Sequence, residues 1–178
     1  DADMTDQLWR WSAIDLAQAI ARGAISSEDA TRSVLARIEA VNPKINAVVD
    51  VMADEAIRAA RDADTARRGG VACGPLHGVP VTVKVNVDTK GRATTNGVVA
   101  FRDLVATEDS PVVANLRKAG AVIVGRTNTP AFSHRWFTDN ELHGATRNPW
   151  GKGLTPGGSS GGAAAALAAG MGAIAHGN

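Results

Sequence analysis

The stretch that decides the fold is Thr155-Pro156-Gly157-Gly158-Ser159-Ser160-Gly161-Gly162, which runs directly into the alanine-rich segment 163–170. Glycine pairs permit backbone angles and close approaches that a Cβ would block. We expect Ser160 to be the N-cap of the alanine-rich helix, with its hydroxyl bonded to a free amide of the first turn. Ser159 then lies just before a helix N-terminus, where backbone amides favour negative charge.

Two other interpretations of this stretch are open from the pattern alone. Glycine and serine are typical of flexible linkers, but linkers do not usually lead straight into a well-formed apolar helix. A phosphate nest is the second alternative. It is the weaker one, because no lysine follows the glycines as it does in a P-loop.

A second informative stretch is 74–85, in which prolines and glycines precede Val81-Thr82-Val83-Lys84-Val85. The valines predict a buried strand. Lys84 among them has two interpretations. It is either an edge-strand lysine in water, or a desolvated lysine whose lowered pKa lets the neutral amine act as a base.

Together the two stretches resemble the signature of the amidase signature family, in which a lysine, a cis-serine and a nucleophilic serine form the catalytic triad. Gly157–Ala165 resembles the family's glycine/serine motif, and Gly74–Lys84 resembles its lysine motif. Segments 119–128 and 144–150 are further matches, so the resemblance covers nearly the whole chain in the family's order. It implies that Lys84 is the catalytic lysine, that Ser159 is the cis-serine after a cis Gly158–Ser159 bond, and that Ser160 orients Lys84 or caps the helix.

The resemblance also implies that one triad member is absent. In the family the nucleophilic serine follows in a stretch similar to D-x-G-G-S, which is expected shortly beyond Asn178. We therefore expect residues 1–178 to be the N-terminal part of a single amidase signature domain. Residues 1–70 would be a helical segment, and residues 71–178 the start of the catalytic α/β core.

The remaining expected site residues come from two loops. The resemblance places Thr95, Asn96 and Gly97 near the substrate, although a plain surface turn is the alternative for this loop. It also implies substrate contacts for Gly157 and Gly158. The bulky segment 129–143 is expected either to wall a substrate pocket or to be a surface flap.

Two positions depart from the family's usual pattern. Val85 follows the lysine where the family often has an acid, and Ala131 stands where another acid is common. The absence of an acid beside Lys84 removes a charge that would favour the ammonium and changes the hydrogen-bond partners expected around Lys84.

Composition restricts the class of protein. The chain has 178 residues, 44% of them hydrophobic, and a net charge of +1 with few aromatic residues. These values give no reason to expect binding to nucleic acid or a membrane. The single Cys73 excludes an internal disulfide, and the histidines have no metal-ligand spacing, so no metal and no cofactor are expected. We expect a cytoplasmic protein with a small amide substrate, and a homodimer is left open.

The predicted elements alternate between helices and strands. Capping signals and apolar spacing predict helices over 12–22, 27–41 (ended by Asn42-Pro43), 52–68 and 110–120. Short apolar runs predict strands over 45–51, 81–85 and 121–124. This rhythm predicts an α/β fold with a mixed, largely parallel sheet covered by helices.

The function that follows from the resemblance is hydrolysis of a carboxamide through an acyl-serine intermediate. One alternative is the glutaminase subunit of a tRNA-dependent amidotransferase, although Val85 and Ala131 fit the pattern of that glutaminase poorly. The other alternative, from a different class, is a catalytically incomplete fragment.

Overall fold

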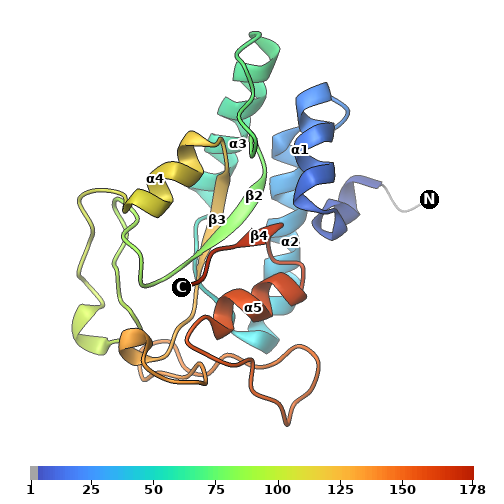
Figure 1. Cartoon of the computed structure of the whole chain (residues 1–178). Coiled ribbons are helices and arrows are strands. Elements are labelled where there is room, and N and C mark those ends of the chain that lie inside the picture. Colours follow the sequence, from blue (N-terminus) through green and yellow to red (C-terminus); the bar gives the residue numbers. More distant parts are fainter. Residues whose placement is uncertain (1–3) are drawn as a thin grey trace.

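A mixed four-stranded sheet lies at the centre of the molecule, with strand order β1-β3-β2-β4 (Figure 1). The computed structural model describes residues 4–178. The strands are β1 Val48–Val51, β2 Pro80–Lys84, β3 Val122–Thr127 and β4 Ile174–Ala175. β2 is parallel to both β3 and β4, whereas β1 is antiparallel to β3. The predicted α/β fold with a largely parallel sheet is therefore confirmed.

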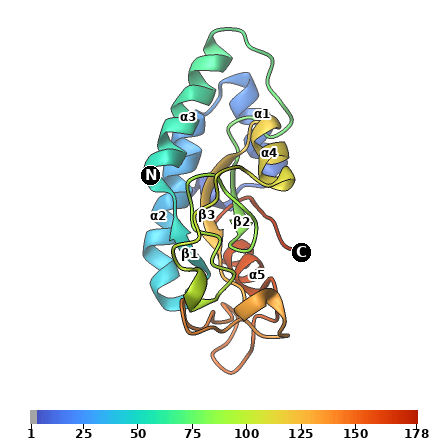
Figure 2. The ribbon, with the colours of Figure 1, turned by 90° about the vertical axis from the view of Figure 1, so that its left-hand side faces the viewer.

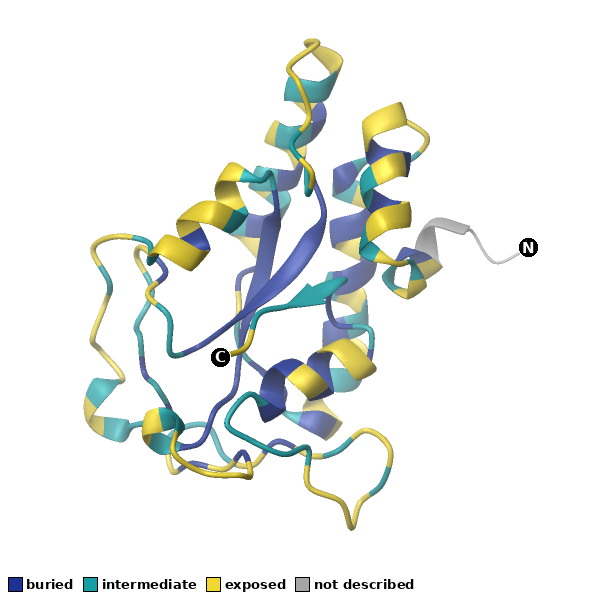
Figure 3. Ribbon diagram, in the orientation of Figure 1, coloured by how far each residue is buried: buried dark blue, intermediate teal, exposed yellow. Residues whose placement is uncertain are grey.

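The two central strands are valine-rich because helices cover both of their faces. Every residue of β2 and β3 is buried, and Figure 3 shows the two strands as a continuous buried unit. Side chains alternate between the faces of a strand. Accordingly, Val122 and Val124 belong to a core with α2, α3 and α5, whereas Ile123 belongs to a core with α1 and α4.

The N-terminal region is helical. It contains the 3₁₀ helix η1 Met4–Arg10, then α1 Ala13–Arg22, α2 Ser27–Ile45 and α3 Ala53–Arg68. Ser12 and Ser26 cap α1 and α2 through bonds from the amides of Asp15 and Asp29, as the capping pattern predicts. α2 and α3 lie side by side (Figure 2).

The predicted end of α2 at Asn42-Pro43 is wrong, because the helix continues through Pro43 to Ile45. A proline inside a helix removes one backbone donor, and its ring crowds the carbonyl oxygen four residues earlier. The chain after the helix is held by the Asn42 side chain, whose Oδ1 accepts hydrogen bonds from the amides of Ala47 and Val48 at 2.9 Å. The strand expected from residue 45 therefore begins only at Val48.

The second half of the chain supplies shorter elements. They are η2 Val99–Phe101, α4 Pro111–Lys118, η3 Ala131–Ser133 and α5 Gly161–Ala168. Ser110 caps α4 with a proline at the first helical position, as predicted. No helix within residues 4–178 is long and apolar enough to cross a membrane.

Candidate active site

Lys84 is the last residue of β2, one of the two central strands, and its side chain is 0% exposed. The alternative of an edge-strand lysine in water is therefore excluded. Because removing an ammonium from water costs free energy, burial lowers the pKa of Lys84 below its ordinary value. The fold thus shifts Lys84 toward the neutral amine, which is the form that can accept a proton.

The Lys84 amine is surrounded by oxygen atoms from the Gly/Ser loop and from the last residue of the chain. Its Nζ lies 2.7 Å from Ser159 Oγ and 3.1 Å from Ser160 Oγ. It also lies 2.9 Å from Asn178 Oδ1 and 3.2 Å from the Asn178 carbonyl oxygen. A neutral amine has two hydrogens for these acceptors and one lone pair, which can face the nearest hydroxyl, that of Ser159.

The Gly/Ser loop has the backbone geometry that the sequence predicted. Gly157 has φ +80°, and the Gly158–Ser159 peptide bond is cis. A Cβ on Gly158 would lie 2.5 Å from the carbonyl oxygen of Arg135. Glycine is thus required at 158, because the loop lies directly against the backbone of residues 135–137.

The prediction that the Ser160 hydroxyl caps α5 is wrong. Ser160 is at the N-cap position with φ −90° and ψ 33°, and its side chain makes no capping hydrogen bond. Its hydroxyl instead accepts from Lys84 and from the Asn178 amide, and donates to the Asn178 carbonyl at 3.1 Å. Of the two expected roles, the contact with Lys84 is the one present.

The loop that contains Thr95, Asn96 and Gly97 is not a plain surface turn. Thr95 is buried, and its hydroxyl lies 2.8 Å from His143 Nε2. Asn96 has φ +46°, and its Oδ1 accepts a hydrogen bond from Ser133 Oγ at 2.8 Å. Both side chains therefore make contacts within the protein, and substrate contact stays a prediction for all three residues.

Comparison with known proteins gives the family. The family model described as Amidase matches residues 29–178. The chain belongs to the amidase signature family.

Individual relatives share most of this chain. The chain is 56% identical to indoleacetamide hydrolase of Bradyrhizobium diazoefficiens, in an alignment that covers 96% of this chain. It is 42% identical to acylamidase of Rhodococcus erythropolis, in an alignment that covers 98% of this chain. The structure of peptide amidase from Stenotrophomonas maltophilia superimposes with a TM-score of 0.89 at 32% identity, covering 96% of this chain and 36% of that one. The chain spans 33% and 37% of the two curated relatives, or about a third of an amidase.

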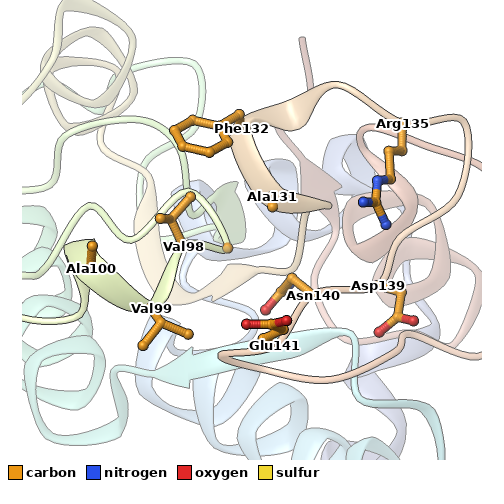
Figure 4. A pocket seen from close by; sticks show the side chains of 10 residues that line it. Val98, Val99, Ala100, Ala131, Phe132, Arg135, Asp139, Asn140 and Glu141 are labelled. Carbon is orange, nitrogen blue, oxygen red and sulfur yellow. The ribbon is translucent and has the colours of Figure 1, made fainter.

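In this member of the amidase signature family, segment 129–143 walls a cavity of about 460 Å³, together with residues 97–100. Figure 4 shows Phe132 and Val98 on one side of the cavity and Asp139, Asn140 and Glu141 on the other. Gly97 belongs to the same wall. Segment 129–143 therefore lines a pocket.

The histidines have no arrangement typical of a metal site, and within the described part of the chain no group of three or more metal-ligating side chains is found. Burial lowers the pKa of His143, which contacts Thr95. Burial, with the nearby charge of Lys84, also lowers the pKa of His176. The amide of His176 bonds to the carbonyl oxygen of Thr82 at 2.9 Å, which extends the pairing of β4 with β2.

Sequence reasoning missed the contacts of Asn86, Ser133 and Asn178. Asn178 bonds to Lys84, and Asn86 donates to Asn178 Oδ1 and to Ser133 Oγ at 3.1 Å each. The one available signal was position, since Asn86 lies two residues after the lysine and Asn178 leads toward the expected nucleophile. Nothing in the pattern joins either residue to Ser133.

Proposed function

We propose that the protein containing this chain hydrolyses a carboxamide to a carboxylate and ammonia or an amine, through an acyl-serine intermediate. The observation that carries this proposal is the 2.7 Å contact between Lys84 Nζ, buried in the centre of the sheet, and Ser159 Oγ. A base whose pKa is lowered, next to a hydroxyl that can both accept and donate, is what a proton relay requires.

In the proposed reaction, neutral Lys84 accepts the Ser159 proton while Ser159 takes a proton from the nucleophilic serine. That serine, expected beyond Asn178, then bonds to the carbonyl carbon of the amide. The proton returns from Lys84 through Ser159 to the leaving nitrogen as the C–N bond breaks. Water hydrolyses the acyl-serine with the same proton path in reverse.

Thr95, Asn96 and Gly97, with the backbone of Gly157 and Gly158, are proposed to shape the substrate side of the site. Gly97 supports this assignment most directly, since it lines the 460 Å³ cavity. The apolar wall of Val98, Val99 and Phe132 suits the hydrocarbon or aromatic part of a small amide. The names of the relatives make indoleacetamide and N-acyl amides, among them a chromogenic anilide, the first compounds to assay.

The test uses the full-length protein that carries this sequence. Its intact mass is measured first, and it is then treated with a serine-directed fluorophosphonate and assayed with indoleacetamide, an anilide and glutamine. The proposal expects one labelled serine C-terminal to Asn178 and release of ammonia or aniline. Labelling and product release should both be lost in Ser159→Ala. Efficient use of glutamine alone would favour the glutaminase alternative. An intact mass of about 18.3 kDa without labelling would favour the catalytically incomplete fragment.

A further inference from the structure

A chain of hydrogen bonds connects the amine of Lys84 to the segment that lines the cavity. Asn178 Oδ1 accepts from Lys84 Nζ at 2.9 Å and from Asn86 Nδ2 at 3.1 Å. Asn86 Nδ2 also donates to Ser133 Oγ at 3.1 Å, and Ser133 Oγ donates to Asn96 Oδ1 at 2.8 Å. Five side chains from four separate parts of the sequence therefore share one path.

Every bond along this path has a defined direction. The single hydroxyl proton of Ser133 is donated to Asn96 Oδ1, so Ser133 offers its lone pairs to Asn86 and to Thr129, whose Oγ1 lies 3.0 Å away. Asn86 then donates one amide hydrogen to Ser133 and the other to Asn178. Because Asn178 receives hydrogens from both Asn86 and Lys84, its carboxamide presents oxygen to the amine.

The orientation of the Asn86 amide depends on these two donated bonds. Its own carbonyl oxygen, Oδ1, is buried and has no hydrogen-bond partner. If the amide were rotated by half a turn, that oxygen would face Asn178 Oδ1, and two acceptors would be in contact. Ser133 and Asn178 together therefore select one orientation of Asn86.

The backbone brings Ser133 to this position by an uncommon conformation. Ser133 closes η3 with φ +57°, in the left-handed region that residues with a Cβ seldom adopt. The amide of the preceding residue, Phe132, bonds to the Asn96 carbonyl oxygen at 3.0 Å. This bond ties η3 to the 95–97 loop, so that the Ser133 hydroxyl lies between Asn86 and Asn96.

We propose that Asn86 and Ser133 are positioning residues for the base. They hold the oxygen of the Asn178 carboxamide toward Lys84, which occupies one amine hydrogen and leaves the lone pair of the neutral amine directed at Ser159. The inference rests on the proposed function, since it concerns how the base of that reaction is aimed. It assigns a role to residues that lie outside the Lys84–Ser159–Ser160 cluster.

The first measurement is steady-state amide hydrolysis by the full-length protein and by Asn86→Ala and Ser133→Ala. Each variant should lower kcat about ten-fold, the effect expected for one hydrogen bond, and change KM less than about two-fold. The matched control is Asn115→Ala, because Asn115 is an exposed asparagine on α4, and it should leave both constants unchanged. A loss confined to KM, or no loss of kcat, would overturn the proposal.

Combined variants separate aiming of the base from general support of the loops. The double variant Asn86→Ala/Ser133→Ala should lose no more kcat than either single variant, because both break the same path. In an Asn178→Asp background both terminal oxygens of residue 178 are acceptors, so Asn86 is no longer needed to turn an oxygen toward Lys84. In that background Asn86→Ala should change kcat less than about two-fold. Additive losses, or a full Asn86→Ala loss in that background, would contradict the inference.

Thermal unfolding and fluorophosphonate labelling accompany each assay. Should Asn86→Ala unfold, Asn86→Leu, which has a similar shape, no charge and no hydrogens to donate, takes its place with the same expected loss of kcat. A wild-type protein that hydrolyses no amide and is not labelled would overturn the proposed function, and this inference with it. An active, labelled wild type with unaffected Asn86 and Ser133 variants would overturn the inference alone.

Discussion

Lys84 Nζ lies 2.7 Å from Ser159 Oγ, although the two residues are 75 positions apart in the sequence. The contact forms because β2 ends where the Gly/Ser loop begins the turn into α5, and α5 contacts β2. A buried amine that meets a hydroxyl at the carboxyl end of a central strand is the feature from which the following predictions start.

Removal of the base should abolish turnover. We expect Lys84→Met, which keeps the length of the side chain without a proton acceptor, to lower kcat by about 10²–10⁴-fold. Lys84→Arg should be equally inactive, because a guanidinium stays protonated. Amide hydrolysis by the full-length protein is the measurement. Turnover by Lys84→Arg within ten-fold of wild type would show that Lys84 is not the base.

The rate should rise with pH through the lowered pKa of Lys84. Burial favours the neutral amine, so kcat/KM should have an acidic limb with a midpoint below 10.5. His176 lies near Lys84, but its pKa is lowered from 6.5, so a limb well above that value belongs to Lys84. A pH–rate profile checks this, with His176→Asn as the control that should keep the limb.

The same pKa shift should make stability depend on pH. Between the lowered folded-state pKa and 10.5 the unfolded chain binds the proton that the folded protein has lost. The free energy of unfolding should therefore rise with pH across that window. Below the folded-state pKa, Lys84 is charged in both states, so the full free-energy penalty of burying the ammonium lowers the stability of the folded protein. Urea unfolding of wild type and Lys84→Met measures the difference. Parallel pH curves for the two proteins would contradict the shift.

The two serines should differ in their effect on turnover. Ser159→Ala removes the hydroxyl nearest Lys84 and interrupts the proposed relay, so the loss of kcat should approach that of Lys84→Met. Ser160→Ala removes a bond to Lys84 and two to Asn178, which are supporting contacts. We expect a loss of about ten-fold for Ser160→Ala. Equal losses from both substitutions would argue that Ser160 shares the relay.

The glycine at 162 should be required for packing. A Cβ at Gly162 would overlap the backbone nitrogen and oxygen of Asn128, whereas a Cβ at Gly153 would meet nothing within 4 Å. Gly162→Ala should therefore destabilise the protein by about 1–3 kcal/mol, and Gly153→Ala is the matched control with little effect. Thermal unfolding of both variants is the measurement. A Gly162→Ala variant as stable as wild type would show that the backbone at Asn128 can move away from α5.

Local patterns carried much of the architecture. The capping serines at 12, 26 and 110 and the valine run of β2 were enough to predict three helices and one central strand, because such signals act over a few residues. The end of α2 was missed because proline was treated as a stop. The structure shows that the helix continues through Pro43, and that the Asn42 side chain bonds to the amides of Ala47 and Val48 just beyond it, contacts that no local rule includes.

The contact between Lys84 and Ser159 was also predictable from the sequence, through the motifs around the two residues. The use of the Ser160 hydroxyl was not, because a serine before a helix can cap it or face another residue. The fold decides between these by placing Lys84 and Asn178 within reach.

The sequence alone therefore determined the class of fold, the family resemblance and the pairing of Lys84 with Ser159. Each of these depends on short motifs and on the order in which they follow one another. The tertiary structure alone decided the burial of Lys84 and the path through Asn86, Ser133 and Asn96. Burial and hydrogen-bond direction arise only when strands and loops distant in the chain meet, because they depend on which atoms exclude water and which donors face which acceptors.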